Sequence, residues 1–155
     1  MSSRGALIDT LEFDRDRVPD LERYPFSIPA LRGLETLEFH PQVTFLVGEN
    51  GSGKSTLLEA VAIKAGFNAE GGTRNFSFAT RRSHSELCDY VRLGRSGRKV
   101  RDGFFLRAES YFNLATEIER LDEPPGAPRV IDSYGGRSLH EQSHGESFLA
   151  LVKHR

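Results

Sequence analysis

The order of apolar and polar positions along the chain predicts strands alternating with helices. Residues 43–48 read VTFLVG, a β-branched apolar run ending in glycine that is typical of a fully buried strand. Residues 54–67 read KSTLLEAVAIKAGF, in which apolar side chains recur at helical spacing until Gly66 ends the helix. The sequence thus predicts a buried strand, a glycine-rich loop and a helix in direct succession.

Shorter elements are expected on both sides of this unit. Before it, residues 14–34 contain three prolines and little periodicity, which indicates an irregular segment with one or two short strands. After it, the pattern predicts a strand, a turn and a second strand over 87–108, a helix over 110–121, a short strand and glycine loop over 129–138, and a helix over 147–155.

Composition indicates an ordinary globular protein. Of the 155 residues 37% are hydrophobic and 28% charged, and this length suits one domain better than two. No apolar run reaches the roughly 18 residues that a membrane span needs, and the first residues lack the apolar core of a signal peptide. The single cysteine, Cys88, excludes an intrachain disulfide and fits a reducing, cytoplasmic location, where we expect a half-buried structural thiol.

Basic residues concentrate between positions 72 and 107. This span holds nine basic and three acidic residues, a local charge of +6, whereas the rest of the chain carries −7. Clustered positive charge attracts nucleic-acid phosphates, so a nucleic-acid partner is one hypothesis. A solvated hairpin is the alternative, which the scarcity of interleaved aromatic residues favours. The residues that would contact nucleic acid are Arg92, Arg95, Arg98, Lys99 and Arg101.

Residues 48–55, GENGSGKS, match the pattern G-x-x-x-x-G-K-[ST] in full. Its glycines allow positive φ angles and a close approach to an anion, while the following helix adds its positive N-terminal end. We expect Lys54 to neutralise the β- and γ-phosphates and the Ser55 hydroxyl to hold Mg²⁺. An accidental glycine turn is the alternative, and the predicted flanking strand and helix argue against it. The expected nucleotide-binding residues are Gly48, Glu49, Asn50, Gly51, Ser52, Gly53, Lys54, Ser55 and Thr56.

The segment FLVGENGSGKSTLLEAVA, residues 45–62, resembles the start of ABC-type ATPases, including the SMC/RecF-like group of AAA-family ATP-binding proteins. The resemblance implies an α/β P-loop NTPase fold, ABC-ATPase-like, with residues 1–155 as one partial domain and a small basic antiparallel β insertion at about 72–107. It also implies ATP and Mg²⁺ as cofactors and ATP hydrolysis by a head-to-tail homodimer. Tyr24 and Phe26 are both candidates for stacking on the adenine, and the sequence does not decide between them.

The segment FFLRAESYFN, residues 104–113, extends the resemblance. It places Glu109 where the family has a Q-loop glutamine that touches Mg²⁺ and the attacking water. This is a departure from the family pattern, although a carboxylate also binds magnesium, directly or through water. Glu109 is therefore a candidate Mg²⁺ ligand, and a helix cap at the surface is an equal alternative.

The segment SHGES, residues 143–147, resembles the S-G-G-Q signature of the same family. Ser143 and Gly145 match the signature, whereas His144 replaces its first glycine and Glu146 its glutamine. In the family the signature begins a helix and binds the γ-phosphate held by the other subunit, which requires a hydroxyl, exposed N–H groups and a helix dipole. We expect the same role in trans for this segment.

The Walker B strand of such ATPases is missing from the sequence. LDEP, residues 121–124, has an acidic pair, but the preceding TEIER is amphipathic helix, and the motif precedes SHGES instead of following it. The chain also ends inside an expected helix. We therefore expect the N-terminal portion of a longer ATPase, with an incomplete parallel sheet and no efficient hydrolysis by this chain alone.

Three other functions compete with this interpretation. Without Walker B, the chain would be a non-catalytic nucleotide-binding or DNA-associated module. A P-loop kinase needs only the phosphate loop, although SHGES and the lack of an arginine-rich lid argue against it. HEQSH, residues 140–144, fits the zinc-protease pattern H-E-x-x-H, which works only inside one helix. Glycines at 135, 136 and 145 disfavour a helix there.

Overall fold

The computed structural model describes residues 7–74, 85–97, 103–107, 111–124, 126 and 128–154. Its strands are β1 (Thr10–Phe13), β2 (Thr36–Glu38), β3 (Gly72–Thr73), β4 (Val91–Gly94) and β5 (Phe104–Phe105). Its α-helices are α1 (Pro29–Arg32), α2 (Lys54–Ala65), α3 (Tyr111–Asp122) and α4 (His144–His154). Short 3-10 helices are η1 (Arg15–Arg17), η2 (Glu86–Tyr90), η3 (Val130–Tyr134) and η4 (Leu139–Glu141).

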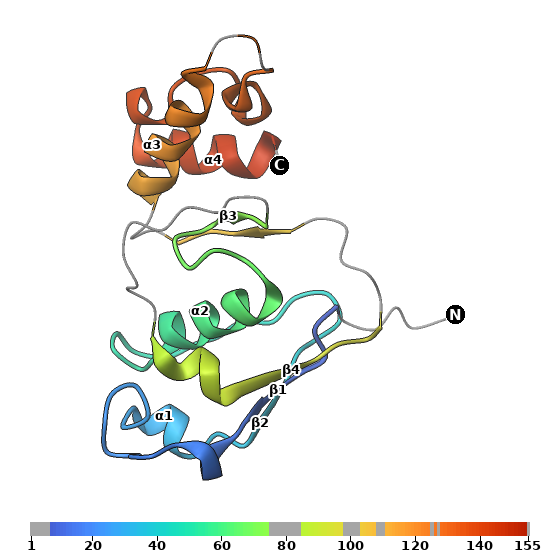
Figure 1. Cartoon of the computed structure of the whole chain (residues 1–155), viewed down its shortest axis with the longest axis vertical. Coiled ribbons are helices and arrows are strands. Elements are labelled where there is room, and N and C mark those ends of the chain that lie inside the picture. The colour runs from blue at the N-terminus through green and yellow to red at the C-terminus, as the bar shows by residue number, and fades with distance from the viewer. Residues whose placement is uncertain are drawn as a thin grey trace.

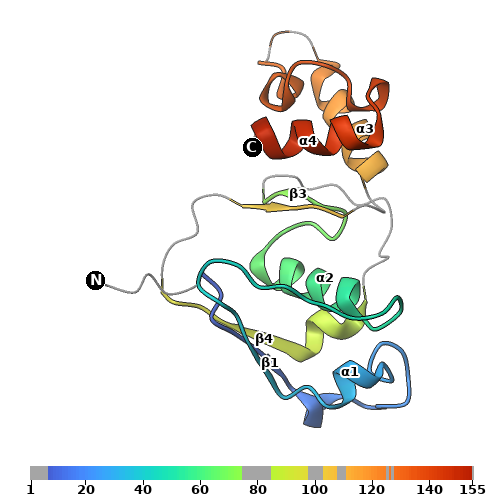
Figure 2. The same cartoon turned by 180° about the vertical axis from the view of Figure 1, so that it is seen from behind.

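The elements form layers that both views show in the same order (Figure 1, Figure 2). The sheet of β1, β2 and β4 lies near one end, α2 packs over it, the β3–β5 pair follows, and α3 and α4 lie at the other end. The phosphate-loop helix and the last helix are therefore separated by the β3–β5 layer.

Strand β1 is the centre of the larger sheet. It pairs antiparallel with β2 on one side and with β4 on the other, so that Leu11 lies opposite both Leu37 and Leu93. Alternation explains the pairing, because Leu11 and Phe13 are buried while Glu12 between them is exposed. Every strand pair among the described residues is antiparallel, unlike the expected parallel sheet.

The N-terminal core lies between this sheet and α2. The fully buried ring of Phe26 stacks on Phe13, with centroids 6.2 Å apart, and meets the edge of Tyr90 at 5.0 Å. Cys88 lies in the same core at 3% exposure, which is deeper than expected, and burial raises the pKa of its thiol. Its place fits the structural role predicted for it.

A second core holds the C-terminal helices together. Helix α3 buries Tyr111, Leu114, Ala115 and Ile118, the i, i+3, i+4, i+7 spacing of one helical face. These side chains pack with Ile131, Tyr134 and Leu139 of the two 3-10 helices.

No helix among the described residues is long and apolar enough to cross a membrane.

Several helix predictions are confirmed. Helix α2 begins at Lys54 and ends at Ala65, and Gly66, with a φ of 93°, is its C-cap as predicted. Helix α3 ends at Asp122, so the LDEP motif is a helix end and not a Walker B strand. Helix α4 forms as expected, and it begins three residues earlier than the pattern indicated.

The predicted buried strand over 43–48 is wrong. These residues form no regular secondary structure, and Phe45 and Val47 are 83% and 91% exposed. A strand needs a neighbour for its N–H and C=O groups, and no described strand pairs with this run. The apolar pattern of this run is typical of a strand, but no neighbouring strand among the described residues pairs with its backbone and its side chains stay exposed.

One prediction of strand pairing and one further strand prediction are also wrong. The segment 87–108 does contain two strands, β4 and β5, but they do not form a hairpin, because β4 pairs with β1 and β5 with β3. The buried Val91 of β4 explains this choice, since it belongs to the core around β1. Residues 130–134 form a 3-10 helix instead of a strand, although the glycine turn after them is present at Gly135 and Gly136, both with positive φ.

Candidate functional site

The loop from Gly48 to Gly53 has the backbone expected of an anion-binding loop. Gly51 and Gly53 adopt φ angles of 81° and 91°, in the left-handed region that favours glycine. A Cβ on Gly53 would lie 2.9 Å from Cγ2 of Ile28, so glycine is required there for space as well. The loop thus turns tightly against Ile28 directly before α2.

The Lys54 side chain folds back over this loop. Its ammonium donates to the carbonyl oxygens of Gly48 at 2.8 Å and Glu49 at 2.6 Å, and it lies 3.4 Å from Oγ of Ser52. The loop therefore holds the ammonium group against its own carbonyl oxygens. In this position the ammonium group could neutralise a phosphate bound by the loop.

The first turn of α2 adds donors to the same place. The N-cap is Gly53, which has no capping side chain, and the first helical bond runs from the Leu57 N–H to the Gly53 carbonyl at 2.9 Å. Earlier N–H groups of a helix have no partner within it, and they carry the positive end of the helix dipole. Ser55 and Thr56 place two hydroxyl groups in this turn.

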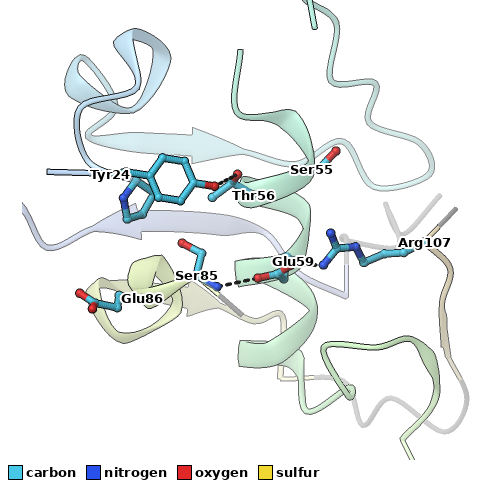
Figure 3. Close-up of a pocket in the computed structure, with 8 residues that line it drawn as sticks. Tyr24, Ser55, Thr56, Glu59, Ser85, Glu86 and Arg107 are labelled. Atoms are coloured by element: carbon cyan, nitrogen blue, oxygen red, sulfur yellow. Dashed lines mark hydrogen bonds and ion pairs between the residues drawn. The ribbon is translucent and has the colours of Figure 1, made fainter. Parts of the chain in front are cut away.

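The structure separates the two candidates for base stacking. Phe26 is fully buried in the core, whereas Tyr24 is 64% exposed. Tyr24, Ile28 and the phosphate-loop residues line a cavity of about 260 Å³. The Tyr24 hydroxyl lies 3.3 Å from Oγ1 of Thr56. Figure 3 shows these two side chains pointing toward one another. Tyr24 is therefore the aromatic side chain placed beside the loop.

A second cavity of about 440 Å³ contains a cluster that sequence reasoning missed. Glu59 is 5% exposed on α2; its Oε1 accepts the Ser85 N–H at 2.8 Å and its Oε2 forms an ion pair with Arg107 (Figure 3). The available signal was a single carboxylate within the otherwise apolar run LLEAVAI. Its partners lie 26 and 48 residues away, which no local pattern indicates.

The SHGES segment begins a helix, as the resemblance implied. Ser143 precedes α4, and its Oγ donates to Oε2 of Glu146 at 2.7 Å, while the Ser143 N–H reaches the same oxygen at 3.0 Å. The Glu146 N–H in turn lies 3.4 Å from Ser143 Oγ, which completes a capping box. Hydrogen bonds from the side chain and backbone of Ser143 hold the pKa of Glu146 below its usual value of 4.5.

Helix α4 and the phosphate loop do not meet within one chain (Figure 1). The expected Q-loop-like residue, Glu109, lies outside the described residues, as do Arg98, Lys99 and Arg101. Of the proposed nucleic-acid contacts, Arg92 forms an ion pair with Asp14, and Arg95 donates to the Lys64 carbonyl at 2.6 Å. The nucleic-acid hypothesis remains a prediction.

The HEQSH segment does not form a zinc-protease helix. His140 and Glu141 belong to η4, Gln142 is extended with φ −107° and ψ 153°, and α4 starts only at His144. The two histidines therefore lie on separate helices. His140 Nε2 instead lies 3.1 Å from Oγ1 of Thr116. No group of three His, Cys, Asp or Glu side chains among the described residues is arranged to hold a metal.

Comparison with known families gives a match to part of the chain. Residues 26–86 match the family of AAA domains, a segment that runs from α1 through the phosphate loop and α2 to β3 and the start of η2. No curated protein and no solved structure matches the chain. The AAA match supports a P-loop ATPase of the AAA type and nucleotide binding in general. It ends before Glu109 and before SHGES, so it does not distinguish the ABC-type group within this class.

Proposed function

We propose that residues 48–56 bind the phosphates of ATP in an ABC-type, SMC/RecF-like P-loop ATPase domain. The observation that carries this proposal is the position of Lys54, whose ammonium is held by two loop carbonyls at the N-terminus of α2. Left-handed Gly51 and Gly53 on either side of Ser52 leave the loop backbone open to an anion. The AAA match over 26–86 supports the coarser part of this assignment, a nucleotide-binding ATPase domain of the AAA type.

The cavity beside the loop also suggests which residues would contact the base and the Mg²⁺ ion. The Tyr24 ring would stack on the base, since it is exposed beside the first turn of α2. Mg²⁺ would be held by the Ser55 hydroxyl, with Glu109 as a further ligand, and would offset charge on the β- and γ-phosphates. Lys54 would neutralise the same oxygens directly.

A second copy of the chain would supply the signature-like segment. Helix α4 and the phosphate loop are separated within one chain, which supports a role for Ser143 at a γ-phosphate bound by another subunit. The N–H groups of His144 and Gly145 begin α4 and would face that phosphate. We propose ATP hydrolysis for this head-to-tail dimer.

Isothermal titration of the chain with ATP and Mg²⁺ tests the phosphate site. We expect binding by the wild type, loss of binding in Lys54→Ala, and unchanged binding in Lys64→Ala. Lys64 is the matched control, because it is an exposed lysine at the other end of the same helix. Equal affinities for all three folded proteins would contradict the proposal.

A further inference from the structure

The buried ion pair between Glu59 and Arg107 lies next to the proposed phosphate site. Glu59 follows Ser55 by four residues, so both side chains project from the same face of α2 one turn apart. Ser55, Glu59 and Arg107 line the same cavity of about 440 Å³. The side chain of Glu59 is 7% exposed and that of Arg107 is 24% exposed. A negative charge is thus fixed beside the Ser55 hydroxyl, which is expected to hold Mg²⁺ next to the phosphates.

Such a charge would oppose phosphate binding if it were not neutralised. Two carboxylates line the cavity, Glu59 and Glu86, and Glu86 forms an ion pair with Arg23. Arg107 is the one cation among the described lining residues. Figure 3 shows the Arg107 guanidinium directed at Glu59 from the side opposite Ser85. The ion pair therefore sets the net charge of this wall of the cavity.

We propose that Arg107 is a positioning residue for nucleotide binding, which acts by neutralising and holding the Glu59 carboxylate beside Ser55. This inference rests on the proposed function, since it concerns the affinity of the same phosphate site. It also gives residues 103–107 a direct influence on the phosphate-loop helix. A buried ion pair that only stabilised the fold would not change affinity according to ligand charge.

The test compares three variants in which charge is removed without large changes of shape: Arg107→Gln, Glu59→Gln and the double variant. Affinities for ATP and for adenosine are measured by calorimetry with Mg²⁺, and folding is checked by thermal unfolding without ligand. We expect Arg107→Gln to weaken ATP binding about tenfold, as one unscreened charge nearby would do. Glu59→Gln should strengthen ATP binding, and the double variant should return to within about threefold of the wild type. Adenosine affinity should stay constant throughout, because adenosine carries no charge.

Four results would overturn the inference. The first is wild-type ATP affinity in folded Arg107→Gln, and the second is an equal loss of ATP and adenosine binding in that variant. The third is weaker ATP binding by Glu59→Gln, which covers the case in which Arg107→Gln fails to fold. Lys54→Ala separates this inference from the proposed function. If the wild type binds ATP and Lys54→Ala does not, a failure concerns Arg107 alone. The fourth is a wild type that binds no nucleotide, which would remove both.

Discussion

The hydroxyl of Tyr24 lies 3.3 Å from Oγ1 of Thr56, so the ring is tied at its polar end to the first turn of α2. The rest of the ring is exposed beside the phosphate loop. An aromatic ring held in this way provides a stacking surface at little cost in side-chain entropy. The same contact leads to a prediction about base recognition.

Replacing Tyr24 by alanine should weaken ATP binding by about 1–3 kcal/mol, because the base loses its stacking partner. Binding of inorganic triphosphate should not change, since that ligand has no base. Tyr24→Phe keeps the ring and should remain close to the wild type. Calorimetry with both ligands checks this, and an equal loss for ATP and triphosphate would show that Tyr24 only supports the loop.

Gly53→Ala should destabilise the protein by at least about 1–2 kcal/mol, the usual cost of a left-handed conformation with a Cβ. The added methyl group must also displace Ile28, whose Cγ2 would be 2.9 Å away. Urea unfolding measures the effect. Gly33→Ala is the control, because Gly33 has φ −93° and a methyl group added there would meet no heavy atom within 4 Å. Similar losses in both variants would contradict this account.

Local patterns predicted the parts of the site that are built from consecutive residues. The glycine-rich loop, helix α2 and the glycine at its end are formed by neighbouring residues. The spacing of glycine and apolar residues along the sequence therefore predicts them. Helix α3 followed from its 3.6-residue period. Its buried face does not include Phe112, which is 68% exposed. The true face begins at Tyr111, one residue earlier.

Long-range pairing was the part that the sequence did not reveal. Strand β1 was not predicted, and its partner β4 lies far along the chain, beyond the phosphate loop and α2, so only the folded core shows why they pair. The ion pair between Glu59 and Arg107 could not be predicted for the same reason, because the two residues lie 48 positions apart in the sequence. The segment 43–48 shows the reverse error, since an apolar β-branched run without a paired neighbour stays exposed.

Exposure of Phe45 predicts a small effect of its substitution. Phe45→Ser should change the free energy of unfolding by less than about 0.5 kcal/mol, as is usual for surface positions. Phe26→Ala, in the fully buried core, should cost about 3–5 kcal/mol and serves as the comparison. Urea unfolding of both variants checks the contrast. A loss of several kcal/mol for Phe45→Ser would support the buried strand that the sequence pattern predicted.

The capping box at α4 predicts a specific pH dependence of stability. Hydrogen bonds from Ser143 lower the pKa of Glu146 in the folded protein relative to its usual value of 4.5. The ionised carboxylate therefore contributes stability that is present above about pH 4.5 and lost as the pH falls through the lowered value. Unfolding free energies of wild type and Glu146→Gln should differ at pH 6 and converge toward pH 3. Ser143→Ala removes the donor, so Glu146→Gln should have no pH-dependent effect in that background; a difference independent of pH would show that Ser143 does not set the charge state of Glu146.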